Sequence, residues 1–251
     1  MSDMYLEPPH LLTAIYSHEP EMTTFQRVCE VVAGLECSLQ DLVEVAPRCQ
    51  QFELLSDLGG ARKLRSPGLR NVRELIAGRH VGLRAVRVAY SHRDLGKVLV
   101  EYQWKKGAER HPISVSMAAD VLGIPEILWS DRDRDSALAI GTWTREIFQR
   151  MISECEPHYG MIAVEKTLPT PSGLKAFDAP LSTEFFVSES LLRGRPSTVS
   201  RLEKLFADGD VKHLPNGLLL SGWAPFNPRR RSLGDPDEGA RRLTSLLRDA
   251  V

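Results

Sequence analysis

The sequence predicts an α+β fold, with an antiparallel or mixed sheet and helices packed on one face. Two patterns of apolar residues support this prediction. Apolar and polar residues alternate over 85–90 and over 97–104, on either side of a short turn that contains Asp94 and Gly96, which indicates a β-hairpin. From 135 to 155 the apolar residues recur at spacings of three and four, which indicates an amphipathic helix. Hairpins mixed with such helices favour a sheet whose core lies under helices.

The first part of the chain predicts strands and helices around this hairpin. We expect, in order, a strand over 11–16, a helix capped by Thr23 or Thr24, a short helix within 38–60, a helix or strand over 72–77 and, after the hairpin, a strand over 111–117.

The second part repeats this alternation of strands and helices. We expect a helix that starts at Ser130 or Asp131 and ends before Pro157, a strand over 159–168, a strand over 183–187, a helix over 198–206, a hairpin turning at Asn216-Gly217 and a helix over 237–251. The order of elements makes 1–120 and 121–251 candidate similar halves of a single domain that covers 1–251.

Composition is that of an ordinary globular chain. Of the 251 residues, 42% are hydrophobic and 26% are charged, and no apolar run approaches the roughly 18 residues needed to cross a bilayer. The four cysteines and seven histidines lack the close spacing of a metal site, so we expect no metal and no cofactor. Without a signal segment at the N-terminus, we expect a cytoplasmic protein.

Charge is strongly segregated near the N-terminus. Residues 1–60 hold two basic and ten acidic residues, a net charge of −8, and residues 61–97 hold ten basic and two acidic residues, a net charge of +8. Two such blocks either attract a charged partner or pair with each other inside one fold. Because both blocks contain apolar residues in regular patterns, we expect pairing, with only the unpaired remainder left for a partner.

Candidate catalytic residues are few. Glu165, at the end of an apolar strand, and His111, at the start of another, are the polar groups we assign to a pocket if the chain is an enzyme that modifies small molecules in bacterial secondary metabolism. The sequence places Ser114 and Ser116 on one face of their strand and His111 on the other. Serines at alternate positions are typical of the solvent-exposed face of a sheet.

Two charged segments are candidate partner-binding sites. Trp129, Asp131 and Asp133 stand directly before or at the start of the long helix, where acids also stabilise a helix N-terminus. Arg229, Arg230 and Arg231 follow an aromatic and proline-rich segment. Basic residues near aromatic ones suit phosphate contacts, so nucleic-acid binding, through these arginines or through 62–97, stays a weaker alternative to a protein partner.

One stretch is similar in style to the immunity proteins of bacterial polymorphic toxin systems. It comprises the long helix with an inward Trp143, the junction Glu156-Pro157-His158-Tyr159-Gly160 and the strand Met161 to Glu165. The resemblance implies a cytoplasmic α+β protein that inhibits a cognate toxin or effector by direct contact. Unlike several nuclease inhibitors of this class, the chain is not strongly acidic, with a formal charge of −1. Because the sequence lacks a catalytic constellation and its charge is segregated, we expect a non-enzymatic binding protein with a protein partner.

Overall fold

The protein was analysed as a computed structural model. It describes residues 9–46, 63–65, 68–78, 85–102, 109–124, 126–176, 181–207, 209–222 and 236–248.

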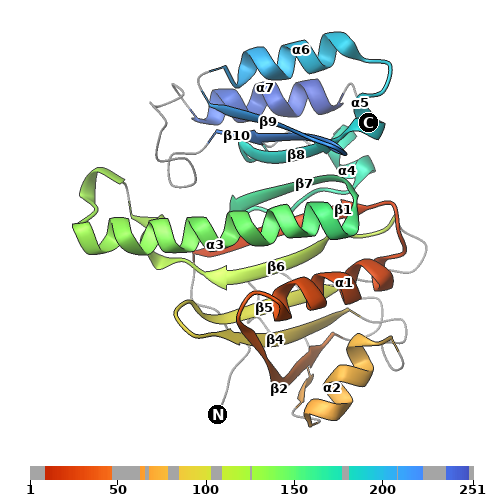
Figure 1. Ribbon diagram of the computed structural model, residues 1–251, viewed down its shortest axis with the longest axis vertical. Coiled ribbons are helices and arrows are strands. Elements are labelled where there is room, and N and C mark those ends of the chain that lie inside the picture. Colours follow the sequence, from red (N-terminus) through yellow and green to blue (C-terminus); the bar gives the residue numbers. More distant parts are fainter. Residues whose placement is uncertain are drawn as a thin grey trace.

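The described strands form one antiparallel sheet of ten strands (Figure 1), in the order β3-β2-β4-β5-β6-β1-β7-β8-β10-β9. Together with the helices, this sheet confirms the α+β class. The strands are β1 His10–Ser17, β2 Cys37–Val45, β3 Lys63–Arg65, β4 Val86–His92, β5 Gly96–Tyr102, β6 Ile113–Ala118, β7 Pro157–Val164, β8 Glu184–Ser188, β9 Asp210–Leu214 and β10 Gly217–Ser221.

Most of the helices lie where apolar periodicity predicts them. The helices are α1 Glu21–Ala33, α2 Leu69–Ile76, α3 Asp131–Cys155, α4 Pro171–Ala176, α5 Glu189–Leu192, α6 Pro196–Leu205 and α7 Pro236–Arg248, with 3-10 turns η1 Asp120–Gly123 and η2 Glu126–Leu128. The hairpin of β4 and β5 and the turn at Asn216-Gly217 are confirmed. The segment 72–77 falls mostly within α2, so it is helical.

Two details of the first part differ from expectation. The helix expected within 38–60 is wrong over its described part, because Cys37–Val45 forms β2 between β3 and β4. Residues 47–62 lie outside the described residues. The N-cap of α1 is Pro20, and the Thr24 hydroxyl donates instead to the Pro20 carbonyl oxygen from inside the helix.

Helices cover different faces in the two parts of the sheet. α1 and α3 pack on one face, over a core that contains Phe25, Phe148 and Phe186. Phe185 and Val187, the neighbours of Phe186 in β8, point to the opposite face of the sheet. Both belong to the cluster beneath α6 and α7. Helices therefore cover both faces of the sheet: α1 and α3 lie on one face, and α6 and α7 lie on the other. The α+β class is confirmed, whereas the expectation that all helices pack on one face is wrong.

The sequence halves are interleaved in this sheet. β1 comes from the start of the chain, yet it pairs with β6 on one side and with β7, which follows α3, on the other. α3 itself packs against both β1 and β7. Gly160 in β7 allows this close approach, because an added Cβ there would lie 2.8 Å from the Ala14 carbonyl oxygen and 2.9 Å from the Phe148 ring.

A row of charged side chains crosses the sheet on the face opposite α1. Arg87 on β4 lies directly between Glu44 on β2 and Glu101 on β5. Its Nη1 is 3.2 Å from Glu44 Oε2 and its Nε is 2.8 Å from Glu101 Oε2, and all three side chains are largely buried. Arg87 belongs to the basic block and Glu44 to the acidic block, so this ion pair is one case of the expected neutralisation between blocks.

Within the described part of the chain, none of the helices has both the length and the apolar character that a membrane span requires.

Candidate functional site

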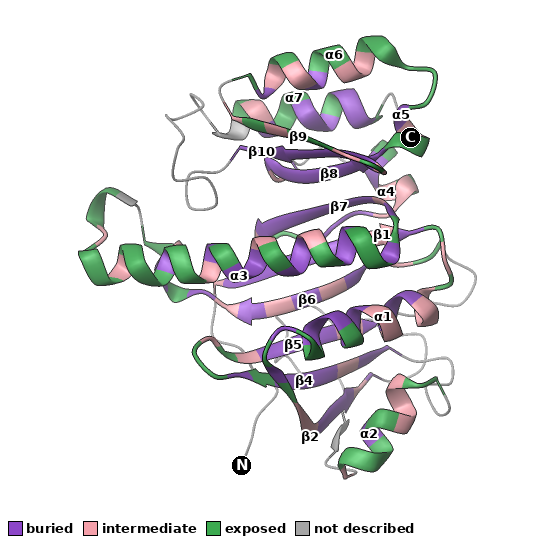
Figure 2. Cartoon of the chain, viewed as in Figure 1, coloured by how far each residue is buried: buried purple, intermediate pink, exposed green. Residues whose placement is uncertain are grey.

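The N-terminal end of α3 projects beyond the edge of the helical layer (Figure 1). We call this end the α3 tip and define it by Ile124, Ile127, Leu128, Trp129 and Leu138. The burial colouring in Figure 2 shows how it differs from the rest of the helix: the N-terminal turns of α3 are largely exposed, and the C-terminal turns alternate between exposed and buried residues. The tip is attached to the core through buried Val121 and Ala137.

A capping box fixes the first turn of α3. The Ser130 hydroxyl accepts a hydrogen bond from the Asp133 amide at 3.2 Å, and the Asp133 carboxylate accepts hydrogen bonds from the Ser130 amide at 2.9 Å and the Ser130 hydroxyl at 2.7 Å. These bonds hold the pKa of the Asp133 carboxyl below its usual range. The capping box therefore satisfies the Ser130 and Asp133 amide groups and stabilises the start of the helix.

The segment before the cap is also tied to itself. The Trp129 indole N–H donates to the Ile124 carbonyl oxygen at 2.8 Å, so the residues on either side of η2 are joined by a hydrogen bond. Leu122, next to this segment, packs against the main core. Ile127 and Leu128 lie between these two points of attachment.

The side chains presented outward are large and apolar. Ile127 is 89% exposed, Leu128 68%, Leu138 48% and Ile124 41%. Five large hydrophobic residues are exposed among those the structure describes, and these are four of them. Single exposed apolar residues are ordinary on a monomer, whereas a cluster with charged neighbours marks an interaction site.

Charge around the tip is predominantly negative. The sequence 120–138 carries five acidic and two basic residues. Asp131 is exposed in the first turn, and Arg132 and Arg134 are exposed beside it. The tip therefore combines an apolar centre with a charged border, the arrangement found at the centre and rim of protein interfaces.

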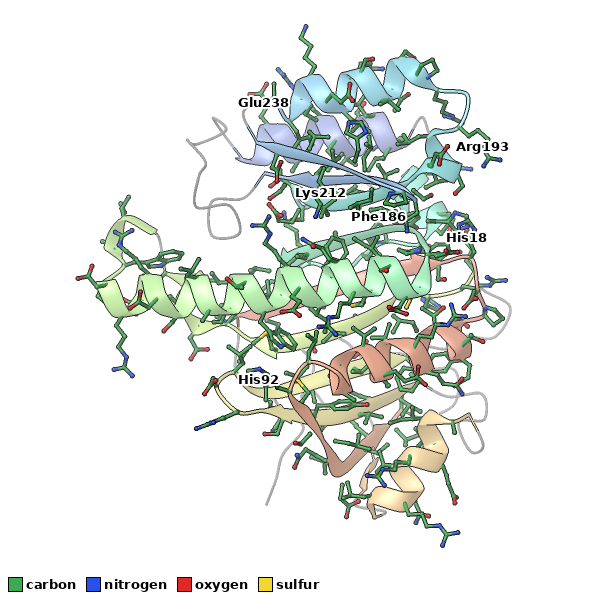
Figure 3. All side chains as sticks on the ribbon, in the orientation of Figure 1. His18, His92, Phe186, Arg193, Lys212 and Glu238 are labelled. Atoms are coloured by element: carbon green, nitrogen blue, oxygen red, sulfur yellow. The ribbon has the colours of Figure 1, made fainter. Side chains whose placement is uncertain are left out.

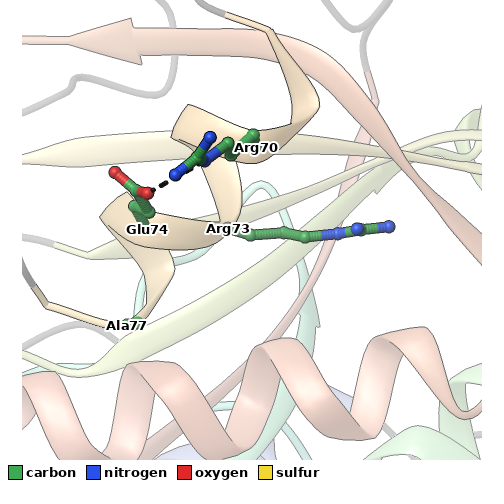
Figure 4. Close-up of a pocket in the computed structure, with 4 residues that line it drawn as sticks. All are labelled: Arg70, Arg73, Glu74 and Ala77. Carbon is green, nitrogen blue, oxygen red and sulfur yellow. Dashed lines mark hydrogen bonds and ion pairs between the residues drawn. The ribbon is translucent and has the colours of Figure 1, made fainter.

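A second surface feature lies on α2. Arg70, Arg73, Glu74 and Ala77 line an open pocket of about 280 Å³ (Figure 4). Arg70 Nε lies 3.4 Å from Glu74 Oε1, and Arg73 extends away from that pair. Leu69, 43% exposed, stands at the start of the same helix. This surface belongs to the basic block of the sequence.

The two candidate catalytic residues do not come together. The His111 amide donates to Glu21 near the start of β6, whereas Glu165 follows the far end of β7 and its Oε1 lies 2.8 Å from His10 Nδ1. The register of β1 with β6 and β7 places them at opposite ends of β1, about seven residues or ~23 Å apart along the strand. Glu165 and His111 therefore do not share one pocket.

The remaining candidate site residues lie in different parts of the chain. Trp129 lies in the tip, Asp131 lies beside it in the first turn of α3, and the Asp133 side chain belongs to the capping box. Ser114 and Ser116 are half-buried on the same face of β6, as alternation predicts. Arg229, Arg230 and Arg231 lie outside the described residues.

The most exposed tip residues, Ile127 and Leu128, were not among the sequence candidates. Their signal is the run Ile124-Pro125-Glu126-Ile127-Leu128-Trp129, in which apolar residues cluster between a glycine and a helix cap without any period. A short apolar run of this kind fits a buried segment equally well. Only the placement of η2 outside the core reveals its exposure.

No protein-family model, curated protein or solved structure matches this chain. Among the described residues, no group of three or more His, Cys, Asp or Glu side chains is placed to hold a metal ion.

Proposed function

We propose that the chain is a non-enzymatic binding protein that contacts a protein partner through the α3 tip. The observation that carries the proposal is the concentration of exposed apolar side chains on one capped helix end. Fully burying a Leu or Ile side chain contributes about 1.5–3 kcal/mol, so Ile127 and Leu128 together supply a useful share of a binding energy. The capping box and the Trp129–Ile124 hydrogen bond are formed before binding, which lowers the entropy that binding costs at these residues.

The chemistry of the tip defines the partner surface that it fits. A convex apolar end fits a concave apolar groove, and the excess of acidic residues over 120–138 favours a groove with a basic border. Active sites are commonly concave and apolar, so a protruding helix end is suited to block one.

The partner we propose is a cognate toxin or effector that the chain inhibits by direct contact. The similarity in style to immunity proteins of polymorphic toxin systems supports this class, through the buried Trp143 of α3 and the junction at 156–160. The tip lies at the opposite end of that same helix. Inhibition would then follow from occupying the partner's groove.

Affinity purification from the native host tests the binding surface. Tagged wild-type protein is compared with Ile127→Asp in the tip and with Arg201→Glu on the distant α6 as a matched control. We expect a protein that is enriched by the wild type and the control and is lost with Ile127→Asp. Equal enrichment by all three proteins would exclude the tip as the binding surface.

Co-expression then tests the inhibitory class. The captured partner is expressed in a heterologous host alone, with the wild-type chain, and with Ile127→Asp. We expect growth arrest that the wild type relieves and the tip variant does not. A captured partner that causes no growth defect would overturn the toxin assignment and leave the binding surface in place.

A further inference from the structure

The α2 surface and the α3 tip carry net charges of opposite sign. Leu69 on α2 is the fifth exposed large apolar residue in the described part of the chain, and it stands at the start of the helix whose Arg70 and Arg73 line the pocket. Helix α2 holds Arg70 and Arg73 against Glu74, a net charge of +1, whereas 120–138 holds five acidic and two basic residues. An apolar, acidic projection and a basic surface with a pocket are matched in charge.

One molecule cannot bring these two surfaces together. In Figure 1, α2 lies at the lower right and the N-terminal end of α3 at the far left of the same view. The helix between the tip and the core is continuous over Asp131–Cys155, and its C-terminal turns are packed into the main core. A contact between the tip and α2 therefore requires a second copy.

We propose that the α3 tip of one copy docks on the α2 surface of a second copy. Ile127, the most exposed apolar residue of the tip, lies against Leu69 and the pocket, and the acidic border of the tip faces Arg70 and Arg73. The contact is heterologous, because it joins two different patches and leaves each end of the pair with one patch unused. Association therefore extends to rings or chains of copies and does not stop at a symmetric dimer.

This association would regulate the proposed binding function. A copy whose tip is covered cannot use that tip on another partner, so partner binding and self-association compete by mass action. The regulatory reading rests on the proposed function, whereas the contact between copies stands on the two surfaces alone. With few side chains on the α2 side, the contact belongs to the small, weak class of interfaces.

Sedimentation velocity over a range of protein concentrations, up to about 1 mM for such a weak contact, tests the proposal. We expect the average mass of the wild type to rise with concentration, and to rise less at about 0.5 M salt than at about 0.05 M, because salt screens the charged border. Ile127→Asp, and separately the pair Arg70→Glu with Arg73→Glu, should each weaken association at least about tenfold, whereas the control Arg201→Glu on α6 should not. All changed residues are exposed, and thermal unfolding confirms that each variant is folded; Leu128→Asp replaces Ile127→Asp if needed.

Mixing the two defective variants gives the decisive result. The Ile127→Asp copy keeps an intact α2, and the Arg70→Glu, Arg73→Glu copy keeps an intact tip, so the mixture should form a one-to-one dimer that neither variant forms alone. A wild type that stays monomeric at the highest concentration, or a mixture that forms no dimer, overturns the proposal. Loss of self-association with tip-dependent capture of a partner intact would refute this contact and leave the proposed function standing.

Discussion

Trp129 donates its indole N–H to the carbonyl oxygen of Ile124 at 2.8 Å, and this bond joins the residues on either side of η2, where Ile127 and Leu128 lie. The bond joins residues five apart that belong to no common helix or strand. The arrangement of the tip therefore depends in part on the Trp129 side chain. The sequence alone shows Trp129 only as an aromatic residue beside a charged segment.

Replacing Trp129 by Phe keeps the ring and removes the donor. A single hydrogen bond contributes about 0.5–1.5 kcal/mol, so we expect partner affinity to fall by roughly two- to twelvefold. Because the bond lies at the periphery, the midpoint of global thermal unfolding should barely change. Binding titrations and thermal scans on the same samples check both parts, and an unchanged affinity would show that the tip does not need this bond.

Ser130→Ala removes the hydroxyl that caps α3. We expect the free energy of unfolding to fall by about 1 kcal/mol, the usual cost of losing an N-cap side chain. Urea denaturation measures it. Ser136→Ala, an exposed serine on the same helix, is the matched control, and an equal effect of both substitutions would count against the cap.

Arg87→Met leaves Glu44 and Glu101 buried without their shared cation. Breaking a buried ion pair by removing one partner costs about 3–5 kcal/mol, so we expect a strongly destabilised variant. Adding Glu44→Gln and Glu101→Gln to it should restore part of the stability, because the two buried carboxylate charges are then gone. A small loss in the single variant, measured by urea denaturation, would contradict this account of the row.

His158 makes stability depend on pH. Figure 3 labels His18, at the edge of the molecule away from the tip; its ring centroid lies 3.4 Å from that of His158, and Tyr16 packs nearby. Burial, with smaller effects of His18 and Arg110, lowers the pKa of His158 to about 4.

The sign of the pH effect follows from that shift. Between the ordinary histidine pKa of about 6.5 and about 4, the unfolded chain binds a proton at this position that the folded chain does not. The contribution of His158 is therefore present above about pH 6.5 and is lost as the pH falls toward 4. We expect His158→Phe to lose less stability than the wild type over this window in denaturation experiments. Parallel curves would refute it.

The local pattern of apolar residues predicts most of the strands and helices. It does not predict which strands pair when they lie far apart in the chain. The alternation over 85–90 and 97–104 and the spacing of three and four over 135–155 depend only on which side faces the core. The helix is confirmed, and the strands are confirmed up to Tyr102, where the described residues of β5 end. The strand β2 was missed because polar Gln40 and Asp41 interrupt it, where the pairing with β4 shifts register. The place of β1 between β6 and β7 depends on contacts about 100 residues or more apart in the chain, which no local period encodes.

The sequence also does not predict that the helices change from one face of the sheet to the other. Phe185-Phe186-Val187 in β8 and Leu218-Leu219-Leu220 in β10 are continuous apolar runs, so they do not indicate which face carries helices. In the structure the middle residue of each run joins the core under α3, and its neighbours join the core under α6 and α7. The exposure of Ile127 is not predicted for the same reason, because a continuous apolar run predicts a buried segment.

Hydrogen exchange of the chain, alone and with its captured partner, tests the central claim most directly. A partner seated on the α3 tip should slow exchange of the backbone amides in 120–138, while β9, at the exposed edge of the sheet, should keep its rate. Unchanged exchange over 120–138 together with protection elsewhere would contradict the assignment of the tip as the binding surface.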